Sequence, residues 1–261
     1  MWVGGLLTGG VWHLPACVPE PISARVGPEG ELFGSILWAP HGRMSTAWGT
    51  RGGCTCRYAY GQGVRSSQEW PPLLSEVWRG VSGHLGDWLP PGSSEPNSAN
   101  LNWYSDTRCE GLNWHSDNEP LFGQPGLPRL IVSVSFGSPR LFQIRLRRRG
   151  PPLGSCELGH CDLAVMDGLA QDLLDHRVAP GGSGWRLNVT FRWVKVHDPE
   201  VCELGRRRVA AAARLARLGL ASSDLEMPRP GFAGGASPGQ QRAGIGGTLL
   251  PGSGQSPPHA G

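Results

Sequence analysis

The spacing of apolar residues changes near residue 99, which separates a helical segment from a series of short strands. Upstream, apolar residues recur every three or four positions, the period of a helix that packs on a sheet; they are Leu73, Leu74, Val77, Val81 and Leu85. Downstream, short apolar or alternating segments separated by Gly and Pro predict strands over residues 100–104, 112–115, 130–136, 141–147, 162–166 and 187–196. Many short strands joined by turns favour a β-sandwich or jelly roll over repeating βαβ units.

The ends of the 261-residue chain lack such a period, and many of its 40 glycines and 24 prolines lie there. Residues 1–39 are interrupted by Gly and Pro and predict a loosely ordered extension, to which we assign no function. Residues 46–60 alternate enough to predict a glycine-interrupted hairpin. Residues 206–220 predict a short basic helix, and residues 222–261 have the Gly, Pro, Ser and Gln composition of a disordered tail.

A histidine and an aspartate two residues apart are the most informative chemical signal. His115 and Asp117 would project from the same side of an extended strand, so both could reach one metal ion. His176, just before a Gly/Pro turn, could supply a third ligand. Two histidines and one carboxylate form the facial triad of non-haem Fe(II) oxygenases, which leaves positions for a cosubstrate and oxygen. An isolated His-x-Asp is more often a surface pair at a strand end, so further motifs must decide.

A regular polar face follows His176. Arg186, Asn188, Thr190 and Arg192 share one side of an extended strand. The planar guanidinium of arginine makes two parallel bonds to a carboxylate, so this face is a plausible clamp for a carboxylate ligand. Pairing with surface acids would explain Arg192 equally well, but it would not explain the whole spacing.

The order of these motifs resembles that of the AlkB-type 2-oxoglutarate-dependent dioxygenases. The resemblance covers roughly residues 40–197, and Cys161 stands where the family more often has Gly. The motifs that carry it are Asn102-Trp103-Tyr104, His115-Ser116-Asp117, residues 131–137, residues 158–166, His176 and residues 186–192. It implies a mainly β fold with flanking helices on one face, the double-stranded β-helix or cupin-like jelly roll.

The resemblance also implies the domain organisation and the cofactors. A dioxygenase domain over residues 40–198 would contain a lid (46–88) and a jelly-roll core (99–197), followed by the basic helix within residues 199–221 and the tail 222–261. Fe(II) would be held by His115, Asp117 and His176, with 2-oxoglutarate and O2 as cosubstrates. Arg186 would contact the distal carboxylate of 2-oxoglutarate, Asn188 and Arg192 would line the same pocket, and Asn102 and Tyr104 would hydrogen-bond the cosubstrate.

The substrate implied by the resemblance is a methylated base in DNA or RNA. Such a base is extruded and stacked on an aromatic side chain, and Trp48, Tyr58 and Tyr60 lie in the lid. Glu119, preceded by Asn118, occupies the place of a family acid that interacts with an exocyclic amine of the base. Aromatic residues in a small hairpin are nonetheless more often core residues than stacking platforms.

The net charge and the cysteine content limit the possible partners and compartments of the protein without deciding between them. A net charge of +3 permits a nucleic-acid partner but does not demand one. Seven cysteines without regular spacing do not form a secreted disulfide framework. Cys54 with Cys56, and Cys156 with His160 and Cys161, could be soft-metal clusters, but we favour structural thiols on ordinary strands. With no apolar run of about 20 residues and no signal peptide, we expect an intracellular monomer away from membranes, in the nucleus, cytoplasm or an organelle.

Three functions remain in view. The favoured one is oxidative demethylation of N-alkylated bases, which releases formaldehyde, succinate and CO2. The second is hydroxylation of a protein or a small molecule by an enzyme of the same fold. The third is a catalytically silent binding module, against which the intact His115, Asp117, His176, Arg186 and Arg192 argue.

Overall fold

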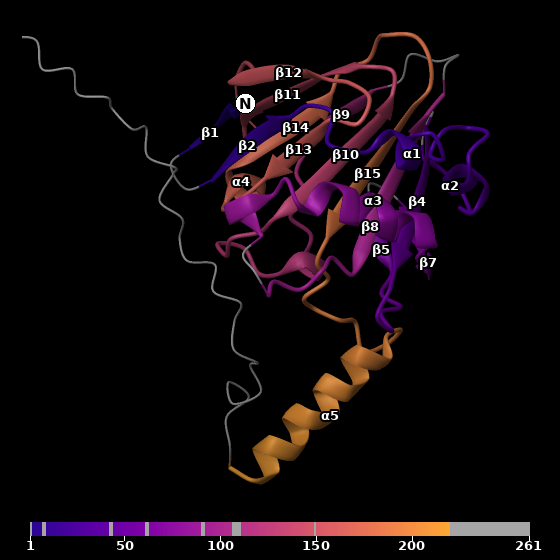
Figure 1. Ribbon diagram of the computed structural model, residues 1–261. Helices are drawn as coiled ribbons and strands as arrows, with labels where there is room; N and C mark the ends of the chain where they lie inside the picture. Colours follow the sequence, from indigo (N-terminus) through magenta and orange to yellow (C-terminus); the bar gives the residue numbers. More distant parts are fainter. Residues whose placement is uncertain are drawn as a thin grey trace, which may run out of the picture. The chain divides into compact units, whose positions relative to one another are not determined.

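The computed structural model describes residues 2–6, 9–41, 44–60, 63–89, 92–105, 111–148 and 150–219. Its larger sheet consists of β1 (Trp2–Leu6), β2 (Gly9–Leu14), β3 (Ala39–His41), β4 (Met44–Thr50), β7 (Gln68–Glu69), β8 (Ser98–Tyr104), β10 (Ile131–Gly137), β13 (Leu163–Met166) and β15 (Arg186–Arg192). The strands follow the order β1-β2-β13-β10-β15-β8-β4-β3, with β7 beside β4 (Figure 1). All these pairings are antiparallel except that of β4 with β7.

A smaller antiparallel sheet faces the larger one. It consists of β9 (Leu112–His115), β11 (Arg140–Leu146), β12 (Gly154–Leu158) and β14 (Leu174–Val178), in the order β12-β11-β14-β9. Ile131 and Met166 of the larger sheet share one apolar cluster with Phe142, Ile144 and Leu158 of the smaller one. The two sheets therefore pack face to face, which is the jelly roll that the sequence predicts. A separate two-stranded sheet joins β5 (Tyr58–Tyr60) to β6 (Gly63–Arg65).

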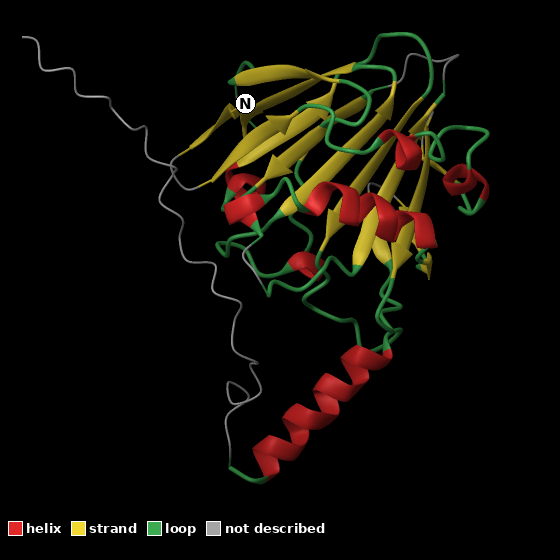
Figure 2. Ribbon diagram, viewed as in Figure 1, coloured by secondary structure: helices red, strands yellow, loops and turns green. Residues whose placement is uncertain are grey.

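Helix α3 (Pro72–Ser82) covers the other face of the larger sheet (Figure 2). Pro72 suits the first turn, where a missing N–H breaks no helical hydrogen bond. The apolar residues of the helix pack against every second residue of β10 and β15; the partners in this core are Leu73, Leu74, Val77, Trp78 and Val81 with Val132, Val134, Leu187, Val189 and Phe191. The remaining helical turns are α1 (Glu20–Ser23), α2 (Glu31–Gly34), η1 (Gly86–Trp88), η2 (Pro120–Phe122) and α4 (Ala170–Leu173).

The two-residue period of β15 separates core from site. Its apolar residues Leu187, Val189 and Phe191 join the core beneath α3. Because successive side chains of a strand alternate between faces, Arg186 and the polar residues at every second position after it point into the space between the two sheets, where they line a cavity. The alternation seen in the sequence thus positions the polar face.

The N-terminal segment is more regular than the sequence suggests. Instead of a loosely ordered extension over residues 1–39, β2 pairs with β13 and extends the larger sheet. Val11 is buried there, and Nε2 of His13 lies 2.8 Å from Oδ2 of Asp162. A short glycine-rich strand carries a weak sequence signal, and the open edge of β13 supplies the partner that orders it.

The hairpin predicted over residues 46–60 is wrong. Strand β4 pairs with β3, β7 and β8, whereas β5 pairs with β6. In the smaller sheet, β12 and β14 are absent from the sequence prediction. The run Leu174–Val178 carries polar residues at its centre, and its strand conformation comes from ladders with β9 and β11 on either side.

The chain continues after β15 into α5 (Glu203–Arg217), close to the predicted basic helix. Gly205 is buried and Leu204 packs against the cluster that contains Cys202, whereas most of the helix after them is exposed. The predicted disordered tail 222–261 lies outside the described residues. Within the described ranges, no helix combines the length and the apolar character needed to cross a bilayer.

Candidate active site

Two neighbouring strands bring the three predicted metal ligands together. His115 is the last residue of β9 and pairs in register with His176 of β14. The centroids of the two imidazole rings therefore lie 4.1 Å apart. Asp117 follows two residues after His115, and the donor atoms of all three residues lie within 4.8 Å of one another. The backbone N–H of Asp117 donates to Oε1 of Gln171 at 2.8 Å, which fixes the turn that carries the carboxylate.

The orientation of His115 suits a metal ligand. Its Nδ1 lies 2.7 Å from the carbonyl oxygen of Asn113. Because a carbonyl only accepts, Nδ1 must carry the proton, and Nε2 then presents a lone pair. Nε2 lies on the side of Asp117, 3.8 Å from Oδ1. Metal-bound histidines commonly donate their other N–H to a backbone carbonyl in this way.

The two carboxylate oxygens of Asp117 have different surroundings. Oδ2 accepts a hydrogen bond from Nη2 of Arg192 at 2.5 Å. Oδ1 is buried and accepts no hydrogen bond from any described residue. Burial opposes ionisation, but the neighbouring Arg192, His176 and His115 together hold the pKa of Asp117 below its usual range. A buried carboxylate oxygen without a donor is costly, and a cation beside the two histidines would satisfy it.

His176 is neutral in this environment. Burial, and then the proximity of His115, lower its pKa to about 3 against the opposing effect of Asp117. Neutral imidazole is the form that binds metals. The three residues therefore fit a divalent metal ion in geometry, charge and protonation.

Arg186 is a buried cation at the opposite wall of the same cavity. It is 1% exposed, and its Nη1 and Nη2 donate to the carbonyl of Leu158 (2.9 Å) and to Oγ of Ser135 (2.7 Å). Both acceptors are uncharged, and burial lowers the pKa of Arg186 to about 10. Among the described residues no carboxylate forms an ion pair with it. The site thus offers a buried positive charge that an anionic ligand could neutralise.

The other predicted cosubstrate residues lie on β8 and β15. The register pairs Asn102 with Asn188 and Tyr104 with Arg186, so all four face the same cavity. Nδ2 of Asn188 donates to Oγ of Ser133 at 2.8 Å. Arg192 reaches the cavity as well, but its guanidinium contacts Asp117 rather than Arg186 or its neighbours.

The cavity encloses about 440 Å³, part of it open to solvent. Several of its residues are not predicted from the sequence, and they contribute both polar groups and an apolar wall: Asn100, Leu112, Ser133, Phe142, Leu158, Met166, Val178 and Thr190. Thr190 could have been found from its place on the polar face of β15. Gln171, which holds the backbone of Asp117, carries no sequence signal at all.

Three of the predicted substrate residues, Trp48, Tyr58 and Glu119, form a connected wall rather than an open platform. Trp48 and Tyr58 are 0% and 1% exposed and stack on each other with ring centroids 4.7 Å apart. The hydroxyl of Tyr58 donates to Oε1 of Glu119 at 2.9 Å and accepts from Nη1 of Arg192 at 2.7 Å. A continuous chain of polar contacts therefore runs from Asp117 through Arg192 and Tyr58 to Glu119.

Two details of this wall concern substrate recognition. Burial and the nearby Asp117 raise the pKa of Glu119, and its Oε2 has no hydrogen-bond partner in the described part of the chain. Asn118 lies between Ser116 and Arg147; with its amide oxygen toward Arg147, it accepts from Nη1 at 2.9 Å. The side chain of Tyr60 lies outside the described residues, although its backbone belongs to β5.

A family model described as the 2OG-Fe(II) oxygenase superfamily matches residues 39–192, the range that contains every residue of this site. The chain belongs to this superfamily. It is 31% identical over 160 residues to the alpha-ketoglutarate-dependent dioxygenase AlkB of Salmonella typhimurium, a match that covers 56% of this chain and 69% of that protein. It is also 33% identical over 143 residues to the alkB homolog 3 of Bos taurus, covering 50% of this chain and 46% of that one.

Two solved structures are also similar to this chain. OsALKBH1 gives a TM-score of 0.48 at 17% identity over 73% of this chain and 99% of its own. An oxidoreductase of the 2OG-Fe(II) oxygenase family from Burkholderia pseudomallei gives 0.48 at 14% identity, over 70% and 82%. From its family and its AlkB relatives, this AlkB-type 2OG-Fe(II) oxygenase is a 2-oxoglutarate-dependent dioxygenase, and its family uses Fe(II), 2-oxoglutarate and O2.

Proposed function

We propose that this oxygenase removes methyl groups from N-alkylated bases in DNA or RNA. One oxygen atom of O2 enters succinate as 2-oxoglutarate loses CO2, and the other enters the methyl group. The C–N bond of the resulting N-hydroxymethyl group then breaks. The carbon leaves as formaldehyde, and the hydroxyl proton passes to the base nitrogen. The similarity to AlkB and to an AlkB homologue favours this substrate class over others that the superfamily could accept.

The metal ligands in this proposal are His115, Asp117 and His176. The observation that carries the assignment is the buried Oδ1 of Asp117, which accepts no hydrogen bond from any described residue although both histidines lie beside it. Bound Fe(II) would supply the oxidising chemistry. The chain would supply three protein ligands on one side and leave the opposite side for the cosubstrate and oxygen. Arg192 keeps Oδ2 of Asp117 occupied and so orients Oδ1.

The cosubstrate site in this proposal is centred on Arg186. Arg186 is 1% exposed, and the acceptors of its hydrogen bonds are neutral. A carboxylate of 2-oxoglutarate would supply the missing counter-charge. Asn102, Tyr104 and Asn188 lie beside it on the paired strands β8 and β15 and would complete the polar lining. Arg192, which we expected from the sequence to line this pocket, lies at the same cavity, and its guanidinium contacts Asp117.

Recognition of the base in this proposal depends on Glu119. Its Oε1 is held by Tyr58, and its buried Oε2 could accept a hydrogen bond from an exocyclic amine. The burial of Trp48 and Tyr58 supports a scaffolding role for these rings, because neither offers a face to a ligand in this conformation. Stacking of the base by Tyr60 stays a prediction from the sequence.

The experiment is a parallel assay of formaldehyde and succinate on three substrates. Oligonucleotides that carry N-methyladenine or N-methylcytosine are incubated with enzyme, Fe(II) and 2-oxoglutarate beside an N-methylated peptide, with Asp117→Ala as the inactive control. We expect equimolar formaldehyde and succinate from at least one oligonucleotide. Succinate formation coupled only to the peptide would move the enzyme to the second class, hydroxylation of proteins or small molecules.

A further inference from the structure

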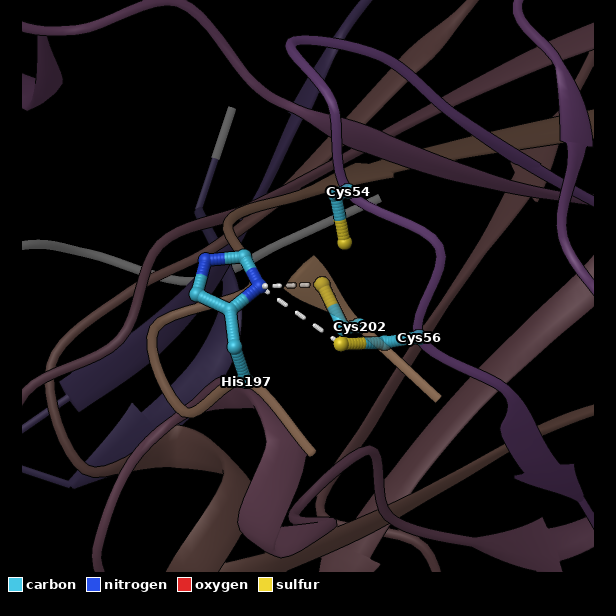
Figure 3. Close-up of side chains that lie close together, drawn as sticks. All are labelled: Cys54, Cys56, His197 and Cys202. Atoms are coloured by element: carbon cyan, nitrogen blue, oxygen red, sulfur yellow. Dashed lines mark hydrogen bonds between the residues drawn. The ribbon is translucent and has the colours of Figure 1, made fainter. Parts of the chain in front are cut away.

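Four potential metal ligands gather outside the active site, where the loop after β4 meets the segment before α5. Cys54, Cys56 and Cys202 are buried, and His197 lies partly buried beside them. Their sulfur and ring-nitrogen atoms lie within 4.8 Å of one another, and Figure 3 shows the side chains pointing toward a common centre. We propose that these four residues, the Cys3His cluster, bind a structural Zn²⁺ ion.

The distances within the Cys3His cluster match a tetrahedral site. Zn–S bonds of about 2.3 Å and Zn–N bonds of about 2.0 Å place sulfur and nitrogen ligands roughly 3.5 Å apart at the tetrahedral angle. Nδ1 of His197 lies 3.5 Å from Sγ of Cys56 and 3.6 Å from Sγ of Cys202. Sγ of Cys54 lies within 4.8 Å of the other three ligand atoms, so it completes the set.

The donor types select the metal. Three thiolates and one imidazole are a closed tetrahedral set that structural zinc sites use, with no position left for a substrate. Iron–sulfur clusters usually require four cysteines, and the His115, Asp117 and His176 triad contains no sulfur ligand. The Cys3His cluster therefore differs from both kinds of iron site. On binding, Zn²⁺ takes the place of the three thiol protons, which pass to solvent.

The two halves of the cluster already dock on each other through other contacts. The N–H of Thr55 donates to Sγ of Cys202, and its hydroxyl donates to the carbonyl of Val201 at 2.8 Å. A Cβ added at Gly205 would lie 2.7 Å from the carbonyl oxygen of His197, so the start of α5 packs directly on that turn. The site is therefore assembled by the fold rather than by loose surface side chains.

The position of the cluster gives the ion a role in the active-site wall. Nε1 of Trp48 donates to the carbonyl of Cys56 at 2.9 Å, and Tyr58 follows two residues later. Tyr58 in turn holds Glu119 and Arg192. Zinc would thus fix the loop that presents Tyr58 by tying it to the segment after β15, and its loss would loosen that wall.

The sequence alone favours structural thiols because the two pairs of ligands lie far apart along the chain. Cys54 and Cys56 lie in the loop after β4 and not on a strand, whereas Cys156 lies within β12. Their partners, His197 and Cys202, are separated from Cys56 by more than 140 residues, so only the folded chain joins the Cys-x-Cys and His-x4-Cys pairs.

The test is the metal content of the full chain purified under reducing conditions, measured by inductively coupled plasma mass spectrometry. We expect about one zinc per chain in the parent, and at least a tenfold loss in Cys56→Ser and in Cys202→Ser. Cys156→Ser removes a buried thiol outside the cluster and should retain zinc. His115→Ala should also retain zinc, which separates this site from the iron site.

A spectroscopic measurement keeps the proposal testable if the serine variants fail to fold. After chelation of the parent under reducing conditions, added Co²⁺ should give thiolate-to-cobalt charge-transfer absorption and the d–d bands of a tetrahedral ion, in His115→Ala as in the parent. A folded parent with neither zinc nor this absorption overturns the proposal. So does a disulfide among Cys54, Cys56 and Cys202 in the reduced preparation, or equal loss of zinc from Cys156→Ser.

Discussion

Replacement of Arg186 by Met should separate folding from cosubstrate binding. Methionine fills a similar volume without a charge, so Arg186→Met removes the buried cation and leaves the apolar contacts of the side chain largely in place. In the protein without ligand, the charge of Arg186 has no carboxylate partner among the described residues. We therefore expect a small change in the stability of the free protein and a large loss of affinity for 2-oxoglutarate.

The structure gives the size of both effects. Burial lowers the pKa of Arg186 from 12.5 to about 10, which corresponds to roughly 3 kcal/mol against the charged form. Met relieves this cost but leaves the acceptors Leu158 and Ser135 without their donors, at roughly 1–3 kcal/mol each. These terms oppose each other, so the free energy of unfolding should change by no more than about 3 kcal/mol. Binding should weaken by about 2–5 kcal/mol, or roughly 30-fold to several thousand-fold in Kd.

The assay is thermal unfolding with Mn²⁺ as a redox-inert metal, over a titration of 2-oxoglutarate. Saturating ligand stabilises the parent by RT ln(1 + [L]/Kd), about 2.7 kcal/mol at 100 times Kd, and Arg186→Met should lose this gain. Arg140→Met is the matched control, because Arg140 is also buried and, within the described part of the chain, donates to carbonyl oxygens, but it is not among the residues that line the cavity. Equal affinity of Arg186→Met and the parent for 2-oxoglutarate would refute the clamp.

Three further predictions concern Asp117, Tyr58 and Asp162. Asp117→Ala should abolish Fe(II)-dependent succinate formation and, by removing the ion-pair partner of the buried Arg192, lower the free energy of unfolding in urea by about 3–5 kcal/mol; parental activity would reject Asp117 as a ligand. Tyr58→Phe should raise KM for the oligonucleotide without changing the requirement for 2-oxoglutarate, since the hydroxyl holds Glu119; an unchanged KM contradicts this. Burial opposes ionisation of Asp162, but the N–H groups of Ala16 and Gly159 and the ring of His13 hold its pKa below 3.8. The ionised carboxylate therefore stabilises the fold above about pH 4, and this stabilisation is lost as the pH falls through the pKa of the folded state. Asp162→Asn should make the urea midpoint less dependent on pH in this acid range.

The parts of the molecule that the sequence predicts are those governed by a short period. The alternation of β15 follows from strand geometry alone, so the separation of Arg186, Asn188 and Arg192 from the apolar core could be read directly. The same holds for α3, whose apolar residues repeat every three or four positions. The proximity of His115 to His176 followed from the family order, not from any local pattern.

The parts that could not be predicted depend on distant partners. Trp48 and Tyr58 sit in a predicted lid, but the segment between them is a loop, and the rings close on each other and on Phe122 in the interior. The link from Asp117 to Glu119 through Arg192 and Tyr58 joins three separate segments. No pattern within one segment encodes such a contact, because the packing of the others decides it.

The central claim is that this site oxidises the methyl group of a nucleic-acid base. The most direct measurement is the intact mass of an oligonucleotide with one N-methylated base after incubation with enzyme, Fe(II) and O2, with and without 2-oxoglutarate. We expect the oligonucleotide to lose its methyl group only when 2-oxoglutarate is present, and Asp117→Ala to prevent the loss. The nucleic-acid reaction is contradicted if every methylated oligonucleotide tested keeps its methyl group while the enzyme still consumes 2-oxoglutarate with another substrate.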